Sequence, residues 1–380
     1  MGKGKQRPSR RRILGRRLGA VAVLTSLVLA AVVLTGGGGS GRSTPGFRHP
    51  AAPSDSAERA AKRRVSMTNL APGSDPSVLP GPVLIADRNN NRLLEISPAG
   101  RLLWEFPRPG ELAPGETFQV PDDAFFAPGG HRVIVTQEDD FVISVIDMTG
   151  DRIVYRYGHP GVSGSSVNYL YNPDDALLTR GGQILLADIK NCRLLVIRPP
   201  AHRIARQLGE TGLCIHQPPI GYGSPNGWFP LSDGNTVVTE INGDWIDVLG
   251  PSGQLLNATH APGFSYPSDT NELRRGVLLS ADYTNPGAIE TFTLGGRLLW
   301  RYAPSGSQAL NQPSLALPLP NGDVLASDDF NDRVVVVDPR TDQIVWQYGH
   351  THIPGRQAGY LARPDGVDLA SPYGLMGRFP

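Results

Sequence analysis

Acidic residues recur at one position of this sequence, directly after prolines that are spaced regularly along the chain. Asp122, Asp174 and Asp365 each follow such a proline. Carboxylate oxygens are the ligands that Ca²⁺ prefers, and one ion needs several of them. If the fold gathers these three side chains, they could form a calcium site. The alternative is a local role, because an Asp after a proline also caps the turn in which it lies.

Histidines also stand at matching positions. The tripeptide Tyr-Gly-His occurs at 157–159 and at 348–350, and His352 follows His350 by two residues, on the same side of an extended chain. Imidazole nitrogens are common ligands of Zn²⁺. His350 and His352 are therefore candidate metal ligands, and His159 and His350 are candidate binding residues. No acid accompanies them at a recognisable spacing, and no G-x-S-x-G or H-E-x-x-H motif identifies catalytic residues.

The prolines mark an internal repeat. A fixed period of this length is typical of a β-propeller, in which each unit is one small sheet that cannot bury its faces alone. Six units predict an all-β fold with six four-stranded antiparallel blades. Each of the six prolines lies 42 to 52 residues from the next and precedes a small capping residue: Pro121-Asp122, Pro173-Asp174, Pro225-Asn226, Pro267-Ser268, Pro313-Ser314 and Pro364-Asp365.

The third unit shows the strands of one blade most clearly. Residues 173–180, 183–190, 193–198 and 203–208 predict a meander of four short strands with tight turns. The second turn carries an Asp-x-x-Asn-x-Arg pattern, in which we expect the Asp to close the turn and pair with the Arg. The pattern is complete in three units and partial in the others: Asp188, Asn191 and Arg193; Asp87, Asn90 and Arg92; Asp328, Asn331 and Arg333; Asp282 and Asn285; Gln137 and Asp140; Glu240 and Gly243.

This pattern, with turns such as Asn321-Gly322-Asp323 and the Tyr-Gly-His loops, resembles the NHL repeat family of six-bladed propellers over roughly residues 82–370. Aromatic residues near strand ends, such as Trp300 and Trp346, also resemble the docking tryptophans of quinoprotein repeats. Those enzymes have eight blades and a bound quinone, so six units argue against that cofactor. We expect these aromatic side chains to pack between neighbouring blades.

The resemblance implies two kinds of chemistry. NHL-like amidating lyases hold zinc at the channel with histidines from several blades, whereas only two units repeat the histidine in this sequence. Sulfotransferase-like propellers use a channel histidine as nucleophile, and His216, on the long loop before the fourth unit, is the nearest candidate. No motif supports His216 in that role. A non-catalytic module and an enzyme therefore both remain open at this stage.

The two ends of the repeat are expected to complete each other. Residues 361–369 begin like an innermost strand with nothing after it, whereas residues 82–108 supply three outer strands without an innermost one. The C-terminal strand should therefore close the ring and remove its exposed edges. The meander then places the post-proline residues and all the long loops on one face, which is the usual seat of binding. We call it the long-loop face, after residues 107–119, 157–170, 208–223, 303–312 and 349–362.

The N-terminal segments predict an address outside the cytoplasm. Residues 1–17 carry eight Lys or Arg and no acid, and residues 18–35 are an uncharged run just long enough to cross a bilayer. Basic residues stay on the cytoplasmic side, so residues 18–35 should anchor an exported chain. The competing interpretation is a cleaved signal that releases a secreted protein. Residues 9–14 also resemble a twin-arginine export signal.

The rest of the chain divides by composition. Residues 36–80 are rich in Gly, Ser, Pro and Ala, which predicts a disordered linker. Residues 81–374 should form the propeller, and residues 375–380 a tail. Export would permit a disulfide between Cys192 and Cys214. Whether their Cα atoms come within bridging distance is not visible in the sequence.

Charge limits the possible partners. Residues 81–380 carry 22 Lys or Arg against 32 Asp or Glu, without the basic footprint that nucleic acids select. We expect a membrane-anchored, exported binding or scaffold module that holds a protein or a glycan on its long-loop face, without a cofactor. The alternative is a lyase, hydrolase or sulfotransferase at the channel mouth, with Ca²⁺ or Zn²⁺ as possible ions. A third hypothesis, a structural module in an envelope complex, predicts an apolar patch near Tyr222, Trp228 and Phe264.

Overall fold

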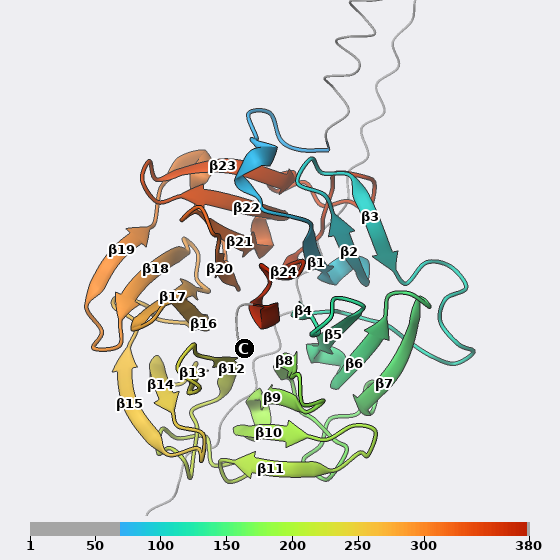
Figure 1. The fold of residues 1–380 in the computed structure, drawn as a ribbon, viewed down its shortest axis with the longest axis vertical. Coiled ribbons are helices and arrows are strands. Elements are labelled where there is room, and N and C mark those ends of the chain that lie inside the picture. Colours follow the sequence, from blue (N-terminus) through green and yellow to red (C-terminus); the bar gives the residue numbers. More distant parts are fainter. Residues whose placement is uncertain (1–68, 378–380) are drawn as a thin grey trace, which may run out of the picture. The chain divides into compact units, whose positions relative to one another are not determined.

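Six four-stranded antiparallel sheets surround one central channel in the computed structural model, which describes residues 69–377 (Figure 1). This all-β propeller is the fold that the proline repeat predicts. The predicted basic segment 1–17 and membrane segment 18–35 lie outside the described residues, as do most of the linker and the last three residues. Between residues 69 and 377, no helix has the length and apolar character needed to cross a membrane.

Each blade is a meander whose strands follow one another outward from the channel. The first three blades, from the innermost strand outward, contain β24 (Pro364–Leu369), β1 (Val83–Asp87), β2 (Arg92–Ile96) and β3 (Leu102–Phe106); β4 (Ala124–Phe126), β5 (Arg132–Gln137), β6 (Val142–Asp147) and β7 (Arg152–Gly158); and β8 (Pro173–Leu178), β9 (Ile184–Asp188), β10 (Arg193–Ile197) and β11 (Ile204–Leu208). The strands of the third blade lie within the segments that the sequence predicts for them.

The other three blades repeat this arrangement. They contain β12 (Pro225–Pro230), β13 (Thr236–Glu240), β14 (Trp245–Leu249) and β15 (Leu255–His260); β16 (Pro267–Arg274), β17 (Val277–Asp282), β18 (Ala288–Thr293) and β19 (Leu298–Tyr302); and β20 (Ala316–Pro318), β21 (Val324–Asp328), β22 (Arg333–Asp338) and β23 (Gln343–Gly349). Short 3₁₀ helices occur in the connections: η1 (Pro76–Val78), η2 (Arg88–Asn90), η3 (Glu138–Asp140), η4 (Ile189–Asn191), η5 (Gly306–Gln308), η6 (Asp329–Asn331) and η7 (Leu375–Gly377).

Packing between blades explains the strand sequences. A middle strand such as β22 lies between two neighbouring blades, so every residue of its Val334–Val337 run is fully buried. The outer strand β15 instead alternates between more and less exposed residues. Two of the expected aromatic contacts also join blades: Trp300 Nε1 donates to Asp342 at 2.9 Å, and Trp346 Nε1 donates to the Pro98 carbonyl at 2.8 Å.

The last strand closes the ring on the first blade. β24 pairs antiparallel with β1, with Val83 opposite Leu369 and Ile85 opposite Val367, as the sequence predicts (Figure 1). Beyond β24 the chain turns back, and Leu375 is fully buried in the core. Residues 69–80, which belong to the stretch assigned to the linker, lie along β23: Leu70 forms a β-bridge with Tyr348.

A buried aspartate ties each Asp-x-x-Asn-x-Arg turn to the loop that enters the same blade. In the third blade, Oδ2 of Asp188 accepts hydrogen bonds from Asn191 Nδ2 and Arg193 Nε, both at 2.8 Å. Its Oδ1 accepts from the backbone N–H of Tyr171, also at 2.8 Å. Asp87 and Asp328 make the same three contacts in the first and sixth blades, with Ala362 and Asn311 as the loop residues.

We expect the arginine of this turn to be essential for stability. Nε of Arg333 lies 2.6 Å from Oδ2 of Asp328, and both side chains are buried. Changing Arg333 to Ala removes this partner and leaves an uncompensated buried carboxylate. The free energy of unfolding should fall by about 3–5 kcal/mol. Arg340→Ala is the control, because Arg340 is 75% exposed and solvent screens its ion pairs with Asp338 and Asp323. Chemical denaturation should show little or no effect of Arg340→Ala, and an equal effect of the two changes would contradict this account.

Candidate functional site

The long-loop face carries two clusters of titratable side chains, and the first surrounds the mouth of the central channel. A cavity of about 70 Å³ opens where the innermost strands begin, and its acidic lining residues are Asp122, Glu138, Asp174, Asp269 and Asp365. The structure therefore brings the three predicted residues Asp122, Asp174 and Asp365 to one small cavity. Asp174 also caps its own turn, since its Oδ1 accepts from the backbone N–H of Asp175 at 3.1 Å.

One arginine pairs with the acids of the outer part of this mouth. Arg88, in the turn between β1 and β2, forms ion pairs with Asp122, with Asp365 at 3.3 Å and with Glu138 at 3.0 Å. Among the described residues, no other basic side chain forms an ion pair with these three acids. Arg88 was not singled out by the sequence, because its partners, which also include Asp139 at 2.7 Å, come from the loop before β4, from η3 and from the C-terminal strand.

A deeper group of acids has no such cation. Carboxylate oxygens of Asp123, Asp175 and Asp269 lie within 4.8 Å of one another, and all three side chains are buried. Burial and the neighbouring carboxylates hold the pKa of each well above its usual range. Such an oxygen donor set suits Ca²⁺. The sequence analysis missed these residues, although Pro-Asp-Asp at 121–123 and 173–175 was a visible signal.

The predicted histidines do not join either cluster. The ring of His159 packs on Tyr169 with centroids 4.3 Å apart, and the ring of His350 packs on Tyr360 at 4.0 Å. Nδ1 of His352 lies 3.3 Å from the Phe330 carbonyl oxygen. Within residues 69–377, no group of three closely spaced ligating side chains contains any of these histidines. His159 and His350 thus each contact a tyrosine of their own loop.

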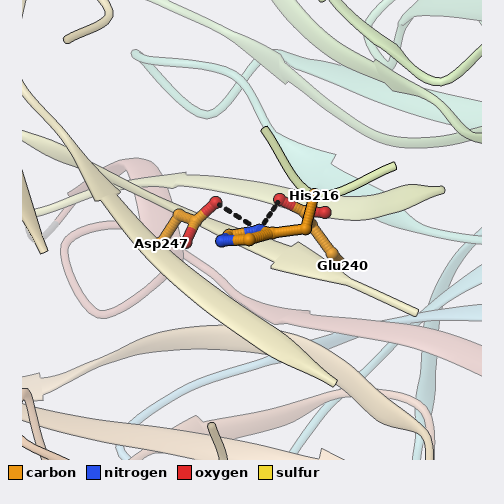
Figure 2. Close-up of side chains that lie close together, drawn as sticks. All are labelled: His216, Glu240 and Asp247. Atoms are coloured by element: carbon orange, nitrogen blue, oxygen red, sulfur yellow. Dashed lines mark hydrogen bonds and ion pairs between the residues drawn. The ribbon is translucent and has the colours of Figure 1, made fainter. Parts of the chain in front are cut away.

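The second cluster lies between the third and fourth blades and contains His216. Figure 2 shows the imidazole of His216 between two carboxylates, with Nδ1 3.1 Å from Oε1 of Glu240 and 3.6 Å from Oδ2 of Asp247. Both acids are fully buried, whereas the His216 side chain is 20% exposed. His216 does not line the channel-mouth cavity. His216, the candidate nucleophile at the channel mouth, therefore belongs to a different site.

Burial dominates the electrostatics of this second cluster. It raises the pKa of Glu240 to about 9 and the pKa of Asp247 to about 6, and it lowers the pKa of His216. Glu240 therefore keeps a proton at neutral pH unless a cation is present. Trp245 stacks on the His216 ring with centroids 4.0 Å apart and an angle of 8° between the planes. The imidazole is thus held in one orientation.

A disulfide holds the loop that carries His216. Cys192, in the turn between β9 and β10, is bonded to Cys214, and their Cα atoms lie 5.1 Å apart. Because Cys214 precedes His216 by only two residues, the bridge fixes the loop close to the cluster. The backbone N–H of Gly223, at the other end of this loop, donates to Oε2 of Glu240. No sequence pattern marks Asp247 as a site residue, because it lies within a strand.

We expect Asp175→Asn to stabilise the protein at alkaline pH. The pKa of Asp175 is higher in the folded state than in the unfolded state. The protonated Asp175 carboxyl therefore stabilises the fold near pH 4, and this stabilisation is lost as the pH rises through the raised pKa of the folded state. Asn carries no charge, so the variant should exceed the wild type at pH 8 by ~1 kcal/mol or more in chelator, since one pKa unit corresponds to about 1.4 kcal/mol. At pH 4 the gain should vanish. Chemical denaturation at both pH values checks this, and a loss of stability at pH 8 would refute it.

Comparison with known proteins shows the fold alone. No protein-family model matches the chain, and no curated protein matches its sequence. A protein of unknown function from Bacteroides caccae matches with a TM-score of 0.54 and 17% identity, over 77% of this chain and 99% of that one. A chain from a nidogen–laminin complex matches with a TM-score of 0.52 and 15% identity, over 76% and 98%. A streptogramin B lyase gives a TM-score of 0.49 and 15% identity, over 79% and 89%.

Proposed function

We propose that this chain is an NHL-like, membrane-anchored propeller outside the cytoplasm, which binds a protein partner through its long-loop face and catalyses no reaction there. The observation that carries this proposal is a set of large apolar side chains that stand exposed on the loops of this face. They come from the connections between the second and third, third and fourth, and sixth and first blades: Val162, Val167, Tyr171, Ile215, Ile220 and Ile353.

These side chains favour a protein over a glycan. Five of the six are aliphatic, so they offer apolar area and no hydrogen-bonding groups for sugar hydroxyls. The residues that the envelope-complex hypothesis singles out, Tyr222, Trp228 and Phe264, are buried and belong to the core instead. The acidic channel mouth on the same face favours a partner with basic side chains.

Rigid attachment of the loops supports a binding role. Buried Asp87, Asp188 and Asp328 each hold the backbone of a loop on this face, and a disulfide holds another. A surface that is ordered before binding loses less conformational entropy when the partner arrives. The loops therefore form a preorganised binding surface.

The proposed location, anchored in the membrane with the propeller outside the cytoplasm, rests on two features. Basic residues 1–17 followed by the apolar run 18–35 are the pattern of an N-terminal anchor with the following chain exported. The disulfide between Cys192 and Cys214 fits an oxidising compartment, because the cytosol keeps such pairs reduced.

One labelling experiment tests both the address and the partner. Val167→Cys and Ile220→Cys place single thiols on the long-loop face, and both native cysteines are occupied in the disulfide. In intact cells that make the full chain, a membrane-impermeant maleimide with a photo-crosslinker should label both positions. Illumination should then join the chain to a second polypeptide, and the product should sediment with membranes.

Leu256→Cys is the matched control, because Leu256 on the outer strand β15 is 52% exposed and Ile220 is 53% exposed. It should be labelled without forming the crosslinked product. Absence of labelling at all three positions in intact cells would contradict export. Labelling without a second polypeptide, or equal crosslinking from Leu256, would contradict a protein partner on the long-loop face.

A further inference from the structure

The fourth blade differs from the first, third and sixth blades at the position where those three pair a buried acid with an arginine. In the first, third and sixth blades the buried Asp is followed five residues later by its arginine partner. In the fourth blade the acid is Glu240, and the residue five positions later is Trp245. Glu240 still holds its loop through the N–H of Gly223, but no arginine accompanies it. The imidazole of His216 lies beside Glu240 instead, with Nδ1 3.1 Å from Oε1.

A second departure adds another buried acid. Asp247 lies on β14 opposite Val238, on the face of the sheet that Glu240 shares. The equivalent residues of the first, third and sixth blades are Leu94, Leu195 and Val335, which are core side chains. Asp247 is fully buried, no backbone N–H of the described residues donates to it, and its close polar neighbours are the carboxyl group of Glu240 and, at 3.6 Å, Nδ1 of His216. Two buried carboxyl groups beside one imidazole, without the arginine that the first, third and sixth blades supply, form a costly arrangement that a bound cation would relieve.

The three donor atoms have the spacing of ligands around one metal ion. Zn²⁺ binds imidazole nitrogen and carboxylate oxygen at about 2.0–2.2 Å, so neighbouring ligand atoms lie roughly 3 to 3.5 Å apart. Nδ1 of His216 lies 3.1 Å from the Glu240 oxygen and 3.6 Å from the Asp247 oxygen. All three atoms fall within 4.8 Å of one another (Figure 2). The nitrogen faces both oxygens at once.

The surroundings keep this arrangement in place and leave it accessible. The ring of Trp245 stacks on His216 with centroids 4.0 Å apart and contacts the tilted ring of His260 at 3.8 Å. The disulfide at Cys214 anchors the loop of His216. The partial exposure of His216 gives solvent a route to the ligand atoms. Three protein ligands and a solvent position are the arrangement of a zinc site that can bind a further ligand.

The geometry points to a divalent metal site, selective for ions of the Zn²⁺ class, formed by His216, Glu240 and Asp247 at the junction of the third and fourth blades. A mixed set of one imidazole and two carboxylates favours Zn²⁺ over Ca²⁺ and Mg²⁺, which take oxygen ligands. The site is separate from the acidic channel mouth and does not depend on the proposed partner.

Metal analysis of the full chain tests this site directly. After purification without chelator and dialysis against metal-free buffer, the protein should retain about one Zn²⁺, and Co²⁺ in its place should give visible absorption bands. His216→Ala and Asp247→Leu should weaken the affinity by ~100-fold or more, because even residues that only support a metal ligand contribute 10–100-fold. Asp247→Leu installs the residue that two other blades carry, so it should fold without metal.

Two further variants separate ligand loss from general damage. His260→Ala removes an imidazole that contacts Trp245 but is not one of the three ligands, and it should weaken Zn²⁺ binding far less than His216→Ala does. Glu240→Gln keeps a carbonyl oxygen for Gly223 and should lose affinity while circular dichroism shows a folded protein. If the wild type retains no Zn²⁺ and shows no Co²⁺ absorption, or if folded Asp247→Leu binds as tightly as the wild type, the inference is wrong.

Discussion

Closure of the ring by the last strand is the constraint on which the rest of the structure depends. A single blade has two apolar faces and can bury them only between two neighbours, so six blades are stable only as a complete circle. β24 supplies the innermost strand of the first blade and pairs with β1, although the other five blades lie between the two strands in the sequence. The circle fixes the direction of every innermost strand, and this direction gathers the long loops on one face.

Repetition then allows chemistry to be recognised as departure from a common pattern. The same position of each blade holds the incoming loop: Asp188 does so with its carboxylate, and Gln137 of the second blade does so by donating to the Gln119 carbonyl at 3.0 Å. The buried acid of three blades is balanced by an arginine. The fourth blade has Trp245 in place of this arginine and has Asp247 in addition. Its loop-holding acid, Glu240, is therefore also one of the three proposed metal ligands. Related blades thus serve as internal controls for one another.

Much of the fold, and the gathering of Asp122, Asp174 and Asp365 at the channel mouth, could be predicted from local sequence signals, whereas the deeper acids and the His216 cluster could not. Pro364 and Asp365 repeat the motif of the other blades, so their place as an innermost strand follows from the pattern alone. Asp175 follows a repeated Pro-Asp pair, but its closeness to Asp123 and Asp269 comes from packing between blades. Asp247 has no comparable signal, because its significance comes from burial beside side chains of another strand and a loop. His216 was noticed only through family resemblance. Its carboxylate neighbours come from β13 and β14, and the packing of its loop onto the fourth blade is a tertiary event that no local pattern encodes.

Hydrogen exchange at the closing strands tests the central claim most directly. If the ring is closed as described, the paired amides of β24 and β1, such as those of Val367 and Ile85, should exchange only through global unfolding, with protection equal to that of the inner strands of the fourth blade. If β24 detaches independently, its amides will exchange through a local opening with a much lower free energy. That result would contradict a closed ring and the single functional face derived from it.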